Sequence, residues 1–384
     1  MYGAYVYGNE AMNNIVNIEG DAKIKGDIYS IGIQMPSLAK LSGTVNITGV
    51  AGLSEASVHG YTAGSGTETA SASRKYTLNI TGYNGSIKNV DQFHIMRIAD
   101  QSTVSIRSMN GAVYHGKDPD NIWSSLEGET QILVEGSTLT AGKIVNFAEF
   151  RLKDASLTAS KVAGWENPFV TGGIGEFKDY VISAKNTDIT VTDTITEYNT
   201  LNIENDASKK VILNKVKGNK NSSTCIQSGT VILHNGISTP DQGKFTINDA
   251  EGSASFTTQI AGNLSNGQEG NISASFNTKE SFLTGTADKG TGTTTLAFAN
   301  GARWNMTGNS TLSGLNLNGS GTVDGEGTVD LTYGRTGSAT NARTLTLDTL
   351  DGDGGTFVVD TNINNDTDRI VINGEASGDH KLDV

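Results

Sequence analysis

Short segments with alternating apolar residues recur along the chain at repeated intervals, and this spacing limits the possible folds more than any other feature. Each copy is an alternating triplet followed by a serine: Met96–Ile98 with Ser102, Phe150–Leu152 with Ser156, and Leu201–Ile203 with Ser208. The serines lie 54 and 52 residues apart, and a further segment ends 18 residues before two of the triplets, at Ile80 and Val134. Gly, Asn, Asp and Ser, which favour turns, bound these segments.

Many short strands are compatible with a sandwich, a propeller or a solenoid, and the internal repeat favours the solenoid. We expect coils of roughly 20 to 27 residues, each strand pairing in parallel with its copy about 4.8 Å along the axis. The unit of 52 to 54 residues then corresponds to two coils, one of which carries a long insertion. The apolar residues of the short strands would form a thin, continuous core.

The expected insertions fall at the same place in each unit, which predicts that they line one edge of the solenoid. They cover about 51–75, 108–129, 161–181 and 217–229. Loops on a rigid scaffold commonly carry binding functions. The candidate binding edge comprises the aromatic residues of these insertions: Tyr61, Tyr114, Trp123, Trp165, Phe169, Phe177 and Tyr180. They either form a recognition surface for a glycan or protein, or fold back to cap their own loops.

Charge and cysteine content exclude several classes of protein. The chain carries 41 acidic and 28 basic residues, a formal net charge of −13. Nucleic-acid binding requires a basic surface, so we expect no nucleic-acid partner. Cys225 is the single cysteine, which excludes an internal disulfide and a cysteine-based zinc site. We expect no metal and no cofactor.

The ends of the sequence suggest a fragment of a longer protein. No segment contains the roughly 18 consecutive apolar residues of a membrane-spanning helix. The first residues lack the charged and then apolar pattern of a signal peptide, so we interpret Met1 as the start of a fragment.

The C-terminal third differs from the rest and carries the most specific motifs. These are Trp304-x-x-x-Gly308-x-Ser310, the segment Leu350–Phe357, and a final Asp-Arg-φ-x-φ-x-Gly-x-Ala-x-Gly-x-His-x-Leu-x-Val over 368–384. They resemble the C-terminal passenger region of type V autotransporters of the pertactin-like and diffuse-adherence adhesin groups. The resemblance covers about 115 residues of the chain and is only generic elsewhere.

This resemblance implies an all-β, right-handed parallel β-helix displayed at the cell surface of a Gram-negative-type bacterium, with a translocator β-barrel following in the full-length protein. It divides the chain into a stalk, 1–270, and a C-terminal autochaperone region, 271–384. Phe298, Trp304 and Phe357 are the candidate folding nucleus, because large buried aromatic residues can stabilise the end coils from which a solenoid propagates.

Catalytic motifs are sparse. The Gly-x-Ser-x-Gly element of serine hydrolases is absent, and the five histidines are scattered without metal-ligand spacing. A β-helical lyase or glycosidase would need paired carboxylates, for which Asp118 with Asp120 and Glu166 are the local candidates.

We therefore expect a non-catalytic passenger that acts in adhesion to a host or bacterial surface protein or glycan. A glycan-active enzyme and a self-associating aggregation factor are the alternatives.

Overall fold

The computed structural model describes residues 12–20, 23–29, 41–49, 52–60, 75–111, 130–166, 179–248, 256–318, 325–335, 341–361 and 367–384. The regular elements in these ranges are β-strands, numbered β1 to β33. The chain forms two compact units, Met1–Tyr198 and Asn199–Val384.

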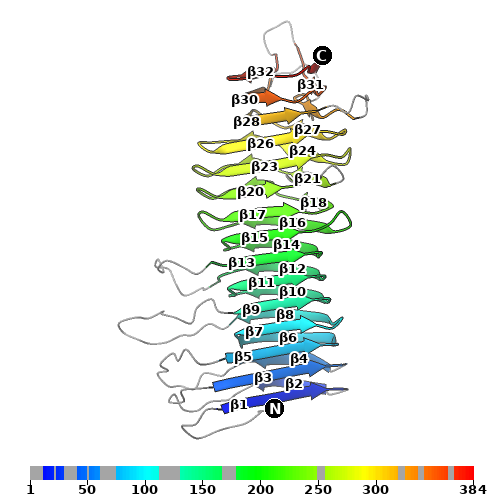
Figure 1. The fold of residues 1–384 in the computed structure, drawn as a ribbon, viewed down its shortest axis with the longest axis vertical. Coiled ribbons are helices and arrows are strands. Elements are labelled where there is room, and N and C mark those ends of the chain that lie inside the picture. The colour runs from blue at the N-terminus through cyan, green and yellow to red at the C-terminus, as the bar shows by residue number, and fades with distance from the viewer. Residues whose placement is uncertain are drawn as a thin grey trace, which may run out of the picture. The chain divides into compact units, whose positions relative to one another are not determined.

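In the first unit, successive coils each contribute one strand to each of two parallel sheets (Figure 1). The first sheet contains β1 (Met12–Glu19), β3 (Leu41–Thr48), β5 (Lys75–Thr81), β7 (Ile95–Ala99), β9 (Gln131–Glu135), β11 (Glu149–Lys153) and β13 (Val181–Lys185). The second contains β2 (Lys23–Tyr29), β4 (Gly52–His59), β6 (Asn84–Phe93), β8 (Thr103–Gly111), β10 (Thr138–Val145), β12 (Ser156–Ala163) and β14 (Asp188–Thr196).

The register of the first sheet confirms the expected two-coil repeat. Ile98 pairs with Val134, and Val134 pairs with Leu152, so Ile98 and Leu152 lie two coils apart in one column. Ile80 pairs with Ile98, which makes the spacing of 18 residues one coil without an insertion. The alignment of the serines was wrong by one residue, because Thr138 pairs with both Thr103 and Ser156. The neighbour of Ser102 is Ser137, whose Oγ accepts a hydrogen bond from the Ser102 amide at 3.2 Å.

Left-handed residues form the corner after each strand of the first sheet. Five successive coils place Gly82, Asp100, Gly136, Asp154 and Asn186 there, with φ between 49° and 57°. Gly, Asn and Asp tolerate this conformation best, which explains why they bound the strands in the sequence.

The strands of the second sheet contain a bend. The alternation of buried and outward-facing residues is broken in these strands. In β6, Lys88 and Asn89 both face outward between buried Ile87 and Val90. In β8, Arg107 and Ser108 do the same between Ile106 and Met109. Two successive outward residues turn the strand, so each coil has three faces around its core.

Columns of apolar residues fill the interior of the unit. Along the first sheet, one column comprises Val45, Leu78, Met96, Ile132, Phe150 and Ile182, all buried. On the outer face, the amide of Asn46 donates to Asn17 at 2.8 Å and that of Asn79 donates to Asn46 at 2.9 Å. Such ladders join successive coils on the outside as apolar contacts do inside.

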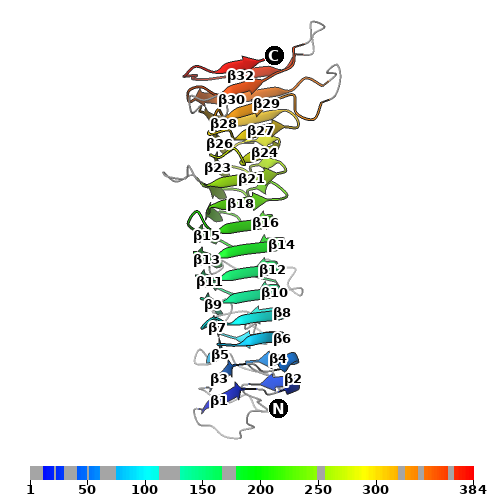
Figure 2. The same ribbon diagram turned by 90° about the vertical axis from the view of Figure 1, so that its right-hand side faces the viewer.

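The second unit is also built of parallel coils (Figure 2). One ladder contains β15 (Thr200–Glu204), β17 (Ser223–Gln227), β20 (Lys244–Ile247), β23 (Asn271–Phe276), β26 (Thr293–Phe298), β28 (Ser310–Leu317), β30 (Thr344–Asp351) and β32 (Arg369–Ile372). Another contains β16 (Lys210–Lys217), β18 (Thr230–Leu233), β21 (Thr257–Ala261), β24 (Phe282–Gly285), β27 (Arg303–Met306), β29 (Thr328–Asp330), β31 (Thr356–Val358) and β33 (Lys381–Asp383). The short strands β19 (Ile237–Ser238), β22 (Leu264–Ser265) and β25 (Ala287–Asp288) form a third ladder that joins β28.

The fold is continuous through the boundary that we expected at residue 270. β23 begins at Asn271 and pairs with β20 before it and β26 after it. The ladder is therefore not interrupted at this point.

Candidate functional site

The long connections of the first unit leave and return at one corner of the coil. Residues 30–40, 61–74, 112–129 and 167–178 all lie between a strand of the second sheet and the next strand of the first sheet. The expectation that insertions share one edge is confirmed for these points of departure and return. We call this the insertion corner, defined by Gly60, Gly111 and Gly164, where the chain leaves, and Tyr76, Thr130 and Tyr180, where it returns.

The two ends of each connection lie close together. A β-carbon built on Gly111 would lie 2.8 Å from the Thr130 hydroxyl, and one on Gly60 would lie 3.1 Å from the Tyr76 β-carbon. One on Gly164 would lie 2.6 Å from the Tyr180 β-carbon. The coil can therefore be continued directly from the departing to the returning residue at these three places.

Tight turns alternate with these departures. The coils without a long insertion turn at Gln92, Asn146 and Glu197, with φ of 61°, 61° and 54°. Each is followed by a buried aromatic residue, Phe93 at the end of β6 or Phe147 and Tyr198 just beyond a strand. The carbonyl oxygens of these turns lie 2.0, 1.7 and 2.2 Å from β-carbons built on Gly60, Gly111 and Gly164, so only glycine fits where the chain departs.

All four expected insertions included residues that belong to regular strands. Residues 217–229 contain β17, which pairs with β15 and β20, so this segment belongs to the regular coil. Residues 51–75 contain β4, which pairs with β2 and β6. The expected insertions 108–129 and 161–181 also include the ends of β8 and β12. Polar residues and glycines within these strands make the alternation of buried and exposed positions difficult to recognise in the sequence.

The residues expected at the binding edge divide into three groups. Tyr61, Tyr114, Trp123, Phe169 and Phe177 lie outside the described residues. Trp165 directly follows Gly164 and is half-buried at the insertion corner. Tyr180 was assigned wrongly to the surface, because it is only 5% exposed and packs beside Gly164 as part of the core.

Glu166 is held at the same corner by two lysines. Its carboxylate accepts hydrogen bonds from Lys161 Nζ at 2.7 Å and Lys143 Nζ at 3.3 Å. The Lys161 hydrogen bond, with the charges of both lysines, lowers the pKa of Glu166 despite partial burial. A carboxylate held in its ionised form is poorly suited to donate a proton to a glycosidic oxygen. The other acidic candidates, Asp118 and Asp120, lie outside the described residues.

His59 lies between two carboxylates just before Gly60. Its Nδ1 is 2.5 Å from Asp91 and its Nε2 is 3.6 Å from Asp27. Burial alone would lower the pKa of His59, but the hydrogen bond and charge of Asp91, with the charge of Asp27, raise it above 6.5. The three groups link β2, β4 and β6 beside the insertion corner.

The expected folding-nucleus residues are buried in the second unit. Phe298 stacks on Phe276 with ring centroids 4.5 Å apart and on Trp304 at 6.2 Å. The Trp304 indole donates to the Gly285 carbonyl at 3.1 Å. Trp304 and Phe357 occupy neighbouring positions on either side of Val329 in one column. Their placement fits a nucleus, and the kinetic role stays a prediction.

The aspartate of the C-terminal motif is a buried acceptor. Asp368 accepts hydrogen bonds from Arg335 Nη1 at 2.9 Å and from the amides of Arg343 at 2.7 Å and Asp360 at 2.9 Å. Burial would raise the pKa of Asp368, but these hydrogen bonds and the charge of Arg335 lower it. The motif thus joins segments on both sides of the gap at 336–340.

Within the described ranges, no group of three or more His, Cys, Asp or Glu side chains is arranged to hold a metal ion. The same ranges contain no helix long and apolar enough to cross a membrane.

The parallel coils around an apolar interior define a right-handed parallel β-helix. Residues 313–384 match the family model described as Pertactin. This match and the nearly all-parallel strand structure fit a pertactin-like autotransporter passenger, and the recognition from the C-terminal motifs is confirmed. No curated protein and no solved structure gave a significant match.

Proposed function

We propose that this passenger acts in adhesion to host or bacterial surfaces and that it does so without catalysis. The insertion corner supports the proposal. A ladder of parallel coils carries successive long connections that begin after Gly60, Gly111 and Gly164, and loops on such a scaffold commonly bind partners. The Pertactin match adds support for surface display, because this family implies a surface-exposed, secreted passenger.

The enzymatic alternative has less support. Glu166, its one described acidic candidate, is paired with two lysines and has a lowered pKa. A retaining or inverting glycosidase needs one carboxyl group that stays protonated at neutral pH. The proposal therefore assigns Glu166 a structural role at the insertion corner.

Replacing a connection tests the adhesive role. Residues 112–129 would be exchanged for a short Gly/Ser link, because the neighbouring positions of Gly111 and Thr130 allow the chain to close without moving the coils. Cells that display the full-length protein should lose adhesion when the connections 61–74, 112–129 and 167–178 are all replaced. Circular dichroism of the purified chain should be unchanged in strand content.

A matched control replaces 249–255, a segment of the second unit, with a link of the same composition. This control should adhere like the parent protein. Full adhesion by the triple replacement, with display confirmed by surface labelling, would contradict the proposal. Mixed populations with and without the passenger would distinguish self-association, since only self-association requires both partners to carry it.

A further inference from the structure

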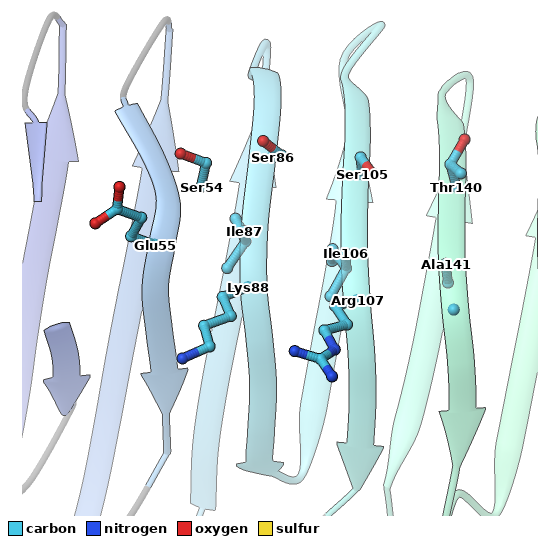
Figure 3. Close-up of a pocket in the computed structure, with 11 residues that line it drawn as sticks. Ser54, Glu55, Ser86, Ile87, Lys88, Ser105, Ile106, Arg107, Thr140 and Ala141 are labelled. Carbon is cyan, nitrogen blue, oxygen red and sulfur yellow. The ribbon is translucent and has the colours of Figure 1, made fainter. Parts of the chain in front are cut away.

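A shallow groove lies on the outer face of the second sheet in the first unit, and none of its lining residues defines the insertion corner. It has a volume of about 720 Å³ and crosses β4, β6, β8 and β10 (Figure 3). One side is a row of hydroxyls from Ser86, Ser105 and Thr140, and the other side carries Lys88 and Arg107.

The register of the strands explains both the row of hydroxyls and the pair of cations. Ser86 pairs with Ser105, and Ser105 pairs with Thr140, so the hydroxyls recur once per coil at about 4.8 Å. The two cations follow at the bend of each strand, where successive residues face outward. At the next coil this position is Gly142, and its lack of a side chain leaves the groove open beside Arg107.

The two cations of the groove, unlike the neighbouring Lys143, have no carboxylate partner in the described part of the chain. Lys88 and Arg107 are exposed, and among the described residues neither forms an ion pair. The nearby Lys143 is paired with Glu166 at 3.3 Å. Lys88 and Arg107 occupy equivalent positions on the neighbouring strands β6 and β8. Their mutual repulsion favours an anionic ligand, because such a ligand neutralises both.

Glu55, which lines the groove at its β4 end, carries a negative charge, opposite to the charges of Lys88 and Arg107. It pairs with Lys25 at 3.3 Å, and both side chains are largely exposed. An anionic ligand would meet this carboxylate as it extends toward β4, so Glu55 limits the favourable part of the groove to β6, β8 and β10.

We propose that this groove binds a linear polysaccharide with repeating carboxylate or sulfate groups. Lys88 and Arg107 would pair with the anionic groups, and the hydroxyl row would hydrogen-bond to sugar hydroxyls along the chain. The net acidity of the protein disfavours nucleic acid, which requires a broad basic surface. The groove has no deep apolar pocket that would select the side chains of an acidic peptide.

This inference names one class of partner for the proposed adhesive function and rests on surface display for its biological role. The binding itself is measured on the purified full chain and uses residues outside the insertion corner. Loss of adhesion after loop replacement and loss of polysaccharide binding are therefore separate results.

The test measures binding of heparin oligosaccharides and polygalacturonate by biolayer interferometry at low and physiological ionic strength. The double variant Lys88→Gln/Arg107→Gln should bind about tenfold more weakly at low salt, since each exposed pair contributes up to about 1 kcal/mol. Glu55→Gln should bind a few-fold more tightly. Ser105→Tyr, which fills the groove and keeps every charge, should weaken binding as the double variant does.

Lys215→Gln/Lys220→Gln removes the same charge from exposed positions of the second unit and should bind like the parent chain. Equal weakening by this control, or unchanged binding by Ser105→Tyr, would overturn the groove as the site. Equally tight binding of polyglutamate or single-stranded DNA would overturn the assignment to polysaccharide. Neutral dextran should not bind. The relative affinities for heparin and polygalacturonate show whether sulfate or carboxylate groups are preferred.

Discussion

At the residue scale, the glycines of the insertion corner and the left-handed residues of the opposite corner have different physical roles. Gly111 is fixed by space, because the Asn146 carbonyl oxygen lies 1.7 Å from the position of its absent β-carbon. Gly136 is fixed only by its φ of 56°, with no atom within 4 Å of that position. Asp154 and Asn186 occupy the equivalent corner in later coils.

Gly111→Ala should therefore lower the free energy of unfolding of the first unit by about 3 kcal/mol, because the backbone of the next coil must move. Chemical denaturation followed by circular dichroism measures the loss. Gly136→Asn is the matched control and should cost less than about 1 kcal/mol, since asparagine tolerates the left-handed region. Equal losses for the two variants would show that space at Gly111 is not the limiting factor.

His59 should make the stability of the first unit depend on pH. Its folded-state pKa is raised above 6.5 through Asp91 and Asp27, so its stabilising contribution is complete below pH 6.5 and is lost as the pH rises through the folded-state pKa. His59→Gln should remove this dependence. Denaturation midpoints of both proteins from about pH 6 to about pH 9 measure it, and parallel pH profiles would rule out the contribution.

At the element scale, we expect the order of folding to depend on the aromatic cluster of β23, β26 and β27. Phe276, Phe298 and Trp304 stack in succession. Among the described residues of the first unit, Phe147 and Phe150 form a tilted pair with ring centroids 5.7 Å apart. A solenoid propagates from its most stable coils, so these strands should form early.

Phe298→Leu, Trp304→Phe and Phe357→Leu should each cost about 1 to 2 kcal/mol, and most of that loss should appear as slower refolding. Phe150→Leu in β11 is the control and should mainly accelerate unfolding. Stopped-flow refolding and unfolding rates give the comparison. If the three C-terminal variants refold at the parental rate, the nucleus lies elsewhere.

The strands and their stacking into coils could be predicted from the sequence more accurately than the residues of the insertion corner. Alternation and the 18-residue spacing of Ile80 and Ile98 located the strands, because inward residues must repeat from coil to coil. Tyr180 was misplaced because the sequence alone does not show where a long connection ends and the next buried position begins. Gly60, Gly111 and Gly164 were the overlooked signal, since each ends a strand or directly follows one where a long connection begins.

At the scale of the whole molecule, each unit is a series of coils that contact only their neighbours. Interior strands pair on two sides, whereas β33 pairs with β31 alone among the described strands, and Leu382 within it is 65% exposed. Stability in such an array is the sum of the coils and the contacts between them, so it decreases toward an unpaired end.

Hydrogen exchange should follow this gradient within each unit. Amides of β32 and β33 should exchange first in the second unit, and those of β23, β26 and β28 last. In the first unit, β1, whose one partner among the described strands is β3, should exchange before β7 and β9. Exchange measured by mass spectrometry on the full chain tests the order, and uniform protection along a unit would contradict it.

The closeness of departure and return at each glycine has a consequence for how such a protein changes over generations. The closure entropy of a flexible segment rises by only about 0.6 kcal/mol when its length doubles. Descendants can therefore lengthen, shorten or exchange these excursions while the ladder beneath them keeps its registry. A mutation of Gly111 itself would damage that ladder, so variation should concentrate between the fixed points and leave the fixed points unchanged.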